Sequence, residues 1–490
     1  MTSEIVPNLD KIPAFVDRIV VSGVARTDES LLKKQFRTLI KSDNLNDLFE
    51  NVRDAKERLT KLGVFRYVFA IVDTADDPAK YKVIFKVEEK NPVTAKVSVT
   101  RSTDGTNKMY GSVRVNDLFR GAEFADLDLE VGTNWFASRC ATLSKPLEGN
   151  PHVRFSVGAT DGSWDHSWAR FLRMERSVFA EVKAESSFGV HNFHWDAIWR
   201  EIEAKDSSTP WSVRKESGPA LKLGLQHTFE RDSRSDSVFP ESGFLCRLSN
   251  ELSTITPGSP TGDDTPTVEE NRALQFKMEG VAQKPFRLTD WLVGELTFSS
   301  GLTHSFTSHP IHIADRFFLG GPLEFRGFRW RSVGPVEPLL RPTQFNLPIT
   351  DPISNDSIDV SANTTGASPI GSEGFWLAGG HLYTPLPYFD AVEGSFASHF
   401  RLHGFYQIGG TLDAPIQRLS NCFSSASGQS VTHRLRSELW SKPRTVLGAG
   451  LVFRLAGLLR IEVNYCIPIQ SQPGDSTSPG FSFGLGMYYL

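Results

Sequence analysis

The sequence is poor in cysteine, has no excess of positive charge and lacks a common nucleotide-binding motif. Its 4 cysteines lie far apart, with no CxxC pair and no Cys/His spacing typical of zinc, so we expect neither a disulfide framework nor a structural metal. The formal net charge of −4 argues against a nucleic-acid binder, which usually carries a basic face. No GxxxxGK[ST] loop occurs, so no nucleotide cofactor is expected.

Long hydrophobic runs are also missing. No stretch of about 18 uncharged apolar residues occurs, so no transmembrane helix is predicted. A transmembrane β-strand needs only about 9–11 residues, half of which can be polar, so a membrane barrel is still compatible with the sequence. The N-terminal "MTSEIVPNLDKIPAF" has no basic segment followed by an apolar one, so neither a secretory signal nor a transit peptide is expected.

The N-terminal part of the chain predicts a small α+β domain. Apolar residues recur at helical spacing in two segments. One predicted strand precedes these two helices, and two predicted strands follow them. In chain order, these segments are a strand at 15–24, helices at 28–40 and 45–65, and strands at 67–73 and 81–89. We therefore predict a tail over 1–14 and a compact domain over 15–93.

After residue 94 the helical period gives way to alternation. In "LLRIEVNYCIPI" (458–469), apolar Leu459, Ile461 and Val463 alternate with Arg460 and Glu462. Period-two alternation with charges on one face is typical of strands that separate an apolar phase from water. An arginine facing lipid at mid-membrane would cost roughly 2–4 kcal/mol, so the charged face is expected to line the interior of a barrel.

Sixteen segments of this kind can be counted. They lie at about 95–101, 110–118, 125–133, 137–147, 153–160, 177–186, 193–203, 220–231, 243–252, 273–285, 291–303, 373–385, 400–412, 445–455, 458–469 and 480–490. Closing such a sheet pairs its edges, as lipid requires. The predicted fold is therefore mainly β. It consists of a transmembrane β-barrel of about 16 strands over 94–490, preceded by the α+β domain. An even number of strands places both termini on one side and the start of the long loop at about 304–372 on the other.

That loop contains the most unusual stretch of the sequence, "RFFLGGPLEFRGFRWRS" (316–332). Its glycines allow tight backbone turns, so the loop can fold back into a wet lumen. There Arg326 can reach polar groups of the inner wall, while Phe328 and Trp330 can stack on guanidinium planes or fill space. Arg329 and Arg331 are expected to be ordinary solvated loop charges.

The stretch "FFLGGPLEFRGF" resembles the signature loop of the outer-membrane assembly superfamily that includes BamA. The domain at 15–93 resembles one polypeptide-transport-associated (POTRA) domain of that superfamily. Three further stretches resemble one branch, the barrel subunits of the mitochondrial sorting and assembly machinery: "RDSRSDSVFPESGF" (231–244), "HLYTPLPYF" (381–389) and "VNYCIPI" (463–469). The resemblance implies a lumen-folded loop with Arg326, Gly327 and Phe328 at its tip.

The partner of Arg326 has two candidates. In many members of the superfamily this arginine meets an aspartate on the thirteenth strand, but here the corresponding "FYQIGG" offers Gln407. Gln407 falls on the predicted lumen face but cannot form an ion pair. Glu462, also on the lumen face, is the alternative.

The final strand fits, by resemblance, the sorting signal of mitochondrial barrel proteins. This signal has a polar position, a glycine and two apolar positions. In "SFGLGMYY" (482–489) they are occupied, in that order, by Ser482, Gly484, Met487 and Tyr489. The resemblance implies a non-enzymatic protein, without cofactors, that inserts β-barrel precursors into the mitochondrial outer membrane through a seam between its first and last strands. Implied partners are the precursors, metaxin-like subunits, cristae-organising (MICOS) proteins and lipid, with the POTRA domain in the intermembrane space.

Three other functions share some of these sequence features. A protein-conducting import channel of the same superfamily would share the architecture, and a passive solute porin would need neither the N-terminal domain nor the arginine loop. "GFSFG" (480–484) is a literal GxSxG, but an esterase needs a later histidine, and none follows. The histidines of "HNFHW" (191–195) and "HPIH" (309–312) lack an acidic or cysteine partner at supporting spacing for a metal.

Overall fold

The computed structural model describes most of the chain. The described residues are 9–75, 77, 79–101, 107–132, 137–258, 272–340, 366–387, 395–416, 443–455, 459–486 and 489. Of the residues and segments named in the predictions, Met487, much of the loop at 304–372 and most of the tail at 1–14 lie outside these residues, as does one of the four cysteines, Cys422.

The N-terminal domain has the predicted order of elements. Its strands form a three-stranded sheet in the order β1-β3-β2, with β1 parallel to β3 and β2 antiparallel to it. The elements are η1 (Leu9–Lys11), β1 (Phe15–Ser22), α1 (Glu29–Gln35), η2 (Leu39–Lys41), α2 (Leu45–Leu62), β2 (Phe65–Thr74) and β3 (Lys80–Glu89). The buried face of α2, with Leu48 and Leu59, packs against Val83 and Phe85 of the sheet. The helix ends at Gly63, whose φ of +83° suits glycine.

Helix α2 also begins where its sequence predicts. Asn44 precedes it in an extended conformation, and the Asn44 side chain accepts a hydrogen bond from the backbone N–H of Asp47. Such a cap satisfies one of the amides that the first helical turn leaves unpaired.

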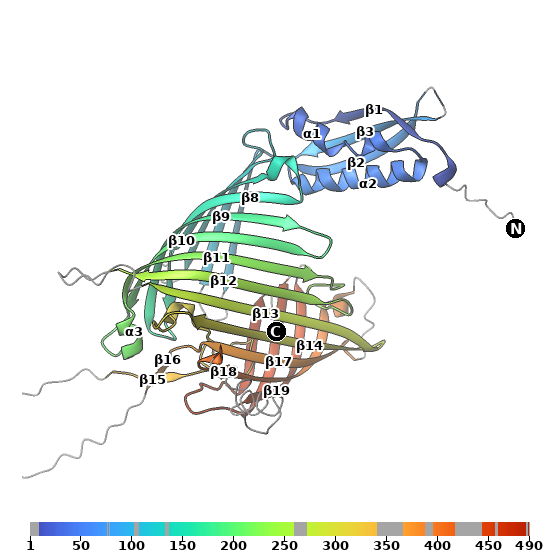
Figure 1. The fold of residues 1–490 in the computed structure, drawn as a ribbon. Helices are drawn as coiled ribbons and strands as arrows, with labels where there is room; N and C mark the ends of the chain where they lie inside the picture. The colour runs from blue at the N-terminus through green and yellow to red at the C-terminus, as the bar shows by residue number, and fades with distance from the viewer. Residues whose placement is uncertain are drawn as a thin grey trace, which may run out of the picture.

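Sixteen further strands form one antiparallel sheet, which confirms the predicted mainly β fold. Its order is β21-β20-β19-β18-β17-β14, followed by β13 to β4 in descending order. The strands are β4 (Val93–Arg101), β5 (Asn107–Asn116), β6 (Phe124–Gly132), β7 (Ala137–Pro146), β8 (Val153–His166), β9 (Phe171–Glu185), β10 (Val190–Ala204), β11 (Gly218–Asp232), β12 (Leu245–Pro257), β13 (Ala273–Thr289), β14 (Leu292–Ser305), β17 (Gly374–Thr384), β18 (Phe400–Leu412), β19 (Arg444–Leu455), β20 (Leu459–Gln470) and β21 (Gly480–Gly486). The sheet curls around a central space (Figure 1).

The N-terminal domain sits at one end of the barrel, which we call the proximal end; the opposite end is the distal end (Figure 1). The connection between β14 and β17 starts at the distal end and holds η4 (Ile313–Asp315), β15 (Val336–Pro338) and β16 (Ala367–Pro369). The remaining short elements are η3 (Leu147–Gly149), α3 (Trp211–Lys215) and η5 (Phe396–His399).

Several strand boundaries differ from the prediction. Strand β8 continues to His166 instead of ending at 160, and β9 begins at Phe171 instead of 177. These extensions carry polar side chains on both faces, so the alternation that predicts a strand stops before the hydrogen-bonded ladder does. The last strand, β21, is described from Gly480 to Gly486, and Tyr489 lies outside any strand, so the predicted end at 490 was too late.

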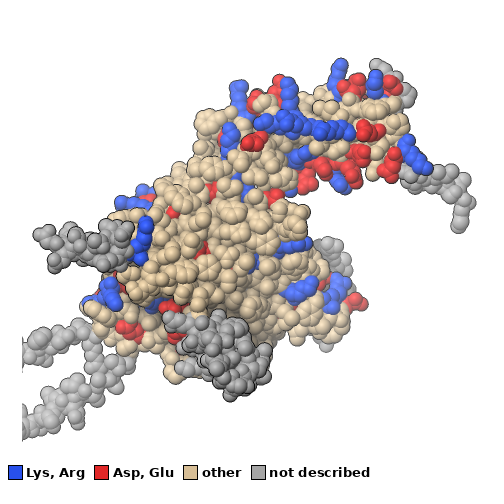
Figure 2. All heavy atoms as spheres, viewed as in Figure 1, with Lys and Arg blue, Asp and Glu red and all other residues tan. Residues whose placement is uncertain are grey.

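The two faces of the sheet differ in polarity. Outward-facing side chains such as Leu225, Leu252 and Phe298 are apolar and exposed, whereas inward-facing Thr297 and Ser299 are buried beneath the loops inside. The barrel wall visible in Figure 2 is accordingly almost free of charged side chains, which gather on the N-terminal domain and at the barrel ends. Among the described residues, no helix is both long and apolar enough to span a membrane.

The sheet has two ends in the described part of the chain. Strand β4 pairs with β5 alone and β21 pairs with β20 alone, so no described backbone ladder joins β4 to β21. The first and the last strand of the barrel are therefore the two edges of the described sheet.

The N-terminal domain is docked on the proximal turns of the barrel. The Asp28 amide donates to the Arg120 carbonyl at 2.8 Å, and Lys61 pairs with Glu185 at 3.0 Å. Phe124 of β6 joins the core of the domain, where it fills the space beside Gly63. Contacts with several separate turns fix the orientation of the domain on the barrel.

Glu89, at the end of β3, organises this junction. Its carboxylate accepts hydrogen bonds from the amides of Arg26 and Thr27, each at 3.0 Å, and from the Thr27 hydroxyl at 2.9 Å. The Thr27 hydroxyl also lies 3.2 Å from a carboxylate oxygen of Asp117, in the β5–β6 turn of the barrel. Burial by itself raises the pKa of Glu89, but the hydrogen bonds from Thr27, Arg26 and Ala25 outweigh it and lower the pKa to about 2.

We expect Glu89→Gln to loosen this junction at neutral pH. Since the folded-state pKa is below the usual value of 4.5, the ionised carboxylate stabilises the fold above about pH 4.5, and this contribution is lost as pH falls toward 2. Protection of the 25–27 amides from hydrogen exchange should therefore fall in the variant at pH 7, and the difference from the parent should shrink by pH 3. The control is Glu88→Gln, because Glu88 is an exposed neighbour; an equal loss in both variants would contradict the assignment.

Candidate functional site

The loop after β14 turns back into the barrel, as its glycines predict. Its backbone pairs with itself through isolated bridges between Phe317 and Ser372 and between Leu319 and Val333. At the tip, Gly327 has a φ of +75°, a conformation that side chains with a Cβ rarely adopt. A Cβ at this position would lie 2.8 Å from the Val446 side chain, so the tip also approaches the wall closely.

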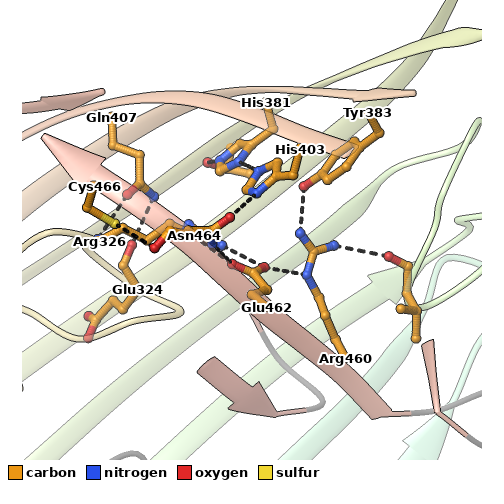
Figure 3. A network of polar contacts seen from close by, with 12 residues as sticks. Glu324, Arg326, His381, Tyr383, His403, Gln407, Arg460, Glu462, Asn464 and Cys466 are labelled. Atoms are coloured by element: carbon orange, nitrogen blue, oxygen red, sulfur yellow. Dashed lines mark hydrogen bonds and ion pairs between the residues drawn. The ribbon is translucent and has the colours of Figure 1, made fainter. Parts of the chain in front are cut away.

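Arg326 forms a buried bidentate ion pair with Glu462 of β20 (Figure 3). The Nε–Oε2 and Nη2–Oε1 distances are both 2.9 Å, and both side chains are 0% exposed. Arg460 donates to the same carboxylate from its Nε. Two guanidinium groups thus share one carboxylate, so removing Glu462 would leave two buried cations without their common partner.

Gln407 of β18 holds the backbone of the tip rather than the guanidinium group. Its Oε1 accepts a hydrogen bond from the Arg326 amide at 3.0 Å, and its Nε2 donates to the Glu324 carbonyl at 3.0 Å. The structure therefore places both candidate partners against the loop tip, with Glu462 opposite the charge and Gln407 opposite the main chain.

Further polar side chains of the inner wall surround this pair; the sequence placed Arg460 on the lumen face but did not show that these residues meet the loop tip. Arg460 Nη2 donates to the Tyr383 hydroxyl at 2.8 Å, and Asn464 Nδ2 donates to Glu462 Oε2 at 2.7 Å. His381 and His403 contact each other at 3.0 Å. The signal available in the sequence is alternation, which puts these side chains on the same face as Glu462 (Figure 3).

Aromatic rings complete the tip. Phe328 packs against Phe325 with ring centroids 4.6 Å apart, and both lie in a buried cluster with Phe405 and Val446. Arg329 is exposed, as predicted. The prediction for Arg331 was wrong: its guanidinium carbon lies 4.9 Å from the Trp168 ring centroid, because the loop runs along the wall and brings this residue onto an aromatic surface.

The loop tip also contacts the segment that leads into the last strand. The Arg329 amide donates to the Ser476 carbonyl at 2.9 Å, and the Ser478 amide donates to the Gly327 carbonyl at 2.8 Å. Gly484 of β21 faces Leu323 of the loop so closely that a Cβ there would lie 2.8 Å from Leu323. The position of β21 therefore depends on the position of the loop.

A second anchor fixes the loop to a different part of the wall. Asp315 of η4 contacts Arg200 of β10 at 2.9 Å and Lys222 of β11 at 2.8 Å. The loop is thus attached to β10 and β11 near its start and to β18 and β20 at its tip.

The turn between β11 and β12, residues 233–244, also crosses the interior, at the proximal end. Its Asp236 pairs with Arg454 of β19 at 2.8 Å, and its Val238 carbonyl accepts a hydrogen bond from Arg460 at 3.1 Å. Phe239 lies beneath Arg401, 5.0 Å from the guanidinium carbon to the ring centroid. This turn lies within the 231–244 stretch singled out in the sequence.

The residues of the predicted last-strand signal lie in different places. Ser482 and Gly484 are in β21, and Met487 is outside the described residues. Tyr489 lies inside the barrel, with its ring centroid 3.7 Å from the Arg460 guanidinium carbon and its hydroxyl 3.3 Å from Glu295. The Tyr489 carbonyl also accepts a hydrogen bond from Gln283 of β13.

The site as a whole holds a loop and a strand end through ion pairs, hydrogen bonds and stacked rings. Within the described ranges, no group of three or more His, Cys, Asp or Glu side chains is arranged to bind a metal.

Comparisons with known proteins give the same architecture. The solved structure described as BamA from Haemophilus ducreyi lacking POTRA domains 1-3 has a TM-score of 0.69 with this chain at 14% identity, covering 97% of this chain and 85% of that one. Sorting and assembly machinery component 50 homolog A of Xenopus laevis is 29% identical over 99% of this chain and 92% of its own length. The Homo sapiens homolog is 28% identical over the same shares.

A family model described as the Omp85 superfamily domain matches residues 174–488, which include the lumen loop, its partners on the wall and the last strand. The chain therefore belongs to the Omp85 superfamily.

Proposed function

We propose that this protein inserts and folds β-barrel precursors in the mitochondrial outer membrane through the seam between β4 and β21. The observation that carries the proposal is the seam itself, where neither strand has a second partner in the described part of the sheet. The similarity to proteins named as components of a sorting and assembly machinery supports the class of activity.

The physical reason for such a seam lies in the membrane. Unpaired N–H and C=O groups of a strand edge cost several kcal/mol each in lipid, so a folding barrel must not expose an edge to the bilayer. The free edge of β4 can pair with the final strand of a client by β-augmentation. Further client strands then add as hairpins until the new barrel closes on itself and separates.

The lumen loop supports this mechanism by positioning β21. Arg326 and Gln407 fix the tip, and the tip in turn holds the segment around Ser476 and the strand position of Gly484. In this proposal, Ser482, Gly484, Met487 and Tyr489 mark the end of the chain that a client replaces. The driving force is client folding, so no covalent chemistry is required of the protein.

The surroundings are proposed from the resemblance. The N-terminal domain, as a POTRA domain, faces the intermembrane space, and the distal end with the start of the lumen loop faces the cytosol. Metaxin-like subunits are the proposed partners on the cytosolic side, and cristae-organising proteins on the other side. The outer-membrane lipid surrounds the apolar wall.

Disulfide crosslinking in isolated mitochondria tests the proposal. Single cysteines are placed along β4 and β21, and a barrel precursor with a cysteine in its final strand is imported. We expect crosslinks from the precursor's last strand to β4 that disappear when its sorting signal is altered. Single cysteines at Arg401 and Arg460, which point into the lumen, serve as the control positions.

Two outcomes would contradict the proposal. Crosslinks confined to lumen positions such as Arg401 and Arg460 would indicate a protein-conducting channel. The absence of precursor crosslinks, together with solute flux through the purified protein, would indicate a porin.

A further inference from the structure

A charged hollow interrupts the apolar outer wall of the barrel on strands β7 to β10. It has a volume of about 270 Å³ and is lined by Arg139, Asp161, Arg176, Glu201 and the ring of Trp199. The ladder registers bring Arg139, Asp161, Arg176 and Trp199 into one row across the four strands. These side chains point outward, since on β10 the alternate residue Arg200 points inward to Asp315.

The charges of the hollow are only partly compensated by one another. Arg176 and Asp161 form an ion pair at 3.3 Å while remaining 81% and 55% exposed. Arg139 and Glu201 have no polar partner among the residues that the structure describes. The hollow therefore offers a free cation, a free anion and an indole ring beside a shared ion pair.

The height of the hollow matches the edge of a membrane. On the proximal side of it, the outward residues of the same strands are apolar, among them Leu143, Val157 and Val178. From Glu185 at the proximal end of β9 to Arg176, the strand extends about 30 Å at about 3.3 Å per residue. With a tilt of about 40°, this corresponds to a rise of roughly 23 Å, close to the apolar band of about 25 Å that barrels present to lipid. The hollow thus lies where headgroups begin, and there outward arginines cost little.

We infer that this hollow binds a zwitterionic phospholipid headgroup of the membrane leaflet at the distal end. A headgroup phosphate fits Arg139 and Arg176, since guanidinium groups recognise phosphate through paired N–H donors. The ammonium group fits the carboxylate of Glu201 and the face of Trp199, the recognition used for quaternary amines elsewhere. This binding site goes beyond the proposed insertion activity and does not depend on it.

The complementarity is local to these strands. On the neighbouring wall, the outward side chains at the distal ends of β12 and β13 are uncharged, among them Thr254, Thr256 and Phe276. If the barrel attracted lipid headgroups only in a general way, charges would not need to be of both signs or to gather on one side of the barrel. Their position therefore favours a specific site on β7 to β10. The bound lipid would fix β7 to β10 in the bilayer on one side of the barrel.

Native mass spectrometry of the delipidated full-length protein, titrated with dioleoylphosphatidylcholine or dioleoylphosphatidylglycerol, tests this inference. We expect Arg139→Gln/Arg176→Gln to weaken binding of the first phosphatidylcholine about 5–10-fold. Glu201→Gln should weaken phosphatidylcholine binding but not phosphatidylglycerol binding, because only the former carries an ammonium group. Lys284→Gln, which removes an outward cation at the opposite end of the wall, should change neither.

Three outcomes would overturn the inference. Equal phosphatidylcholine affinity in all variants would show that the hollow does not bind this lipid. A loss of phosphatidylglycerol binding alone would identify a simple anion site. Loss of co-purifying partner subunits from the arginine variant, with lipid binding unchanged, would identify a protein contact. All substitutions lie on the outer surface, so each variant can first be checked for a folded, heat-modifiable barrel.

Discussion

Replacing Arg326 by alanine is expected to reduce insertion of β-barrel precursors by at least about tenfold. The substitution removes both hydrogen bonds of the bidentate pair, each worth about 1.5–3 kcal/mol, although Glu462 keeps its ion pair with Arg460. That energy is enough to release the loop tip from the wall, and the segment around Ser476 would lose its contact with the loop. Assembly of a radiolabelled precursor in mitochondria that depend on the variant measures the effect.

Two further variants separate the ion pair from general damage to the loop. Arg326→Lys keeps the charge but cannot form the two parallel hydrogen bonds, so we expect an intermediate defect. Arg329→Ala removes the neighbouring exposed arginine and should have little effect. Faster thiol labelling of Ser332→Cys, a buried loop position, should report release of the loop in Arg326→Ala. An insertion defect with unchanged labelling would show that Arg326 acts in some other way.

Replacing Gly327 by alanine is expected to produce the second-largest defect. A Cβ at this φ of +75° costs of order 1–3 kcal/mol, and it would also contact the Val446 side chain at 2.8 Å. The tip should then withdraw from β19 and β20, and we expect insertion to fall about three- to tenfold. The assembly assay used for Arg326 measures this as well.

The matched control is Gly404→Ala on β18. A Cβ at Gly404 meets nothing within 4 Å, so the substitution should leave insertion unchanged. If both alanine variants lose activity equally, the defect reflects loss of glycine flexibility in general rather than the geometry of the tip. If neither does, the tip tolerates displacement and its close approach to Val446 is not required.

Sequence reasoning identified the strands because alternation reports which face a side chain occupies. For the same reason it placed Gln407 and Glu462 in the lumen but could not decide how they divide the contacts with Arg326. Alternation says nothing about which residues meet across the interior. The pairs of Asp315 with Arg200 and of Asp236 with Arg454 join segments far apart in the chain, and they depend on the closure of the whole sheet.

The end of the last strand is a second example. The pattern over 482–489 predicts a continuous strand, whereas β21 is described from Gly480 to Gly486 and Tyr489 is not part of a strand. Inside the barrel, Tyr489 contacts Arg460, Glu295 and Gln283, so side chains of the inner wall hold this residue. Local sequence propensity cannot predict where Tyr489 lies, because the same alternating side chains are compatible with a strand and with contacts inside the barrel.

The interior of this barrel is crossed at several heights, by the lumen loop, by residues 233–244 and by Tyr489. These segments are fastened chiefly to β10, β11, β13, β14 and β18 to β20, and the lumen loop is also hydrogen-bonded to the segment before β21. Among the described residues, none of these contacts involves β4, so β4 can move away from β21 while the crossing segments stay in place. Leakage of ions and metabolites along the barrel axis would then be limited by these segments, independently of how wide the side of the barrel opens. A membrane can thereby keep its permeability low while it receives new proteins.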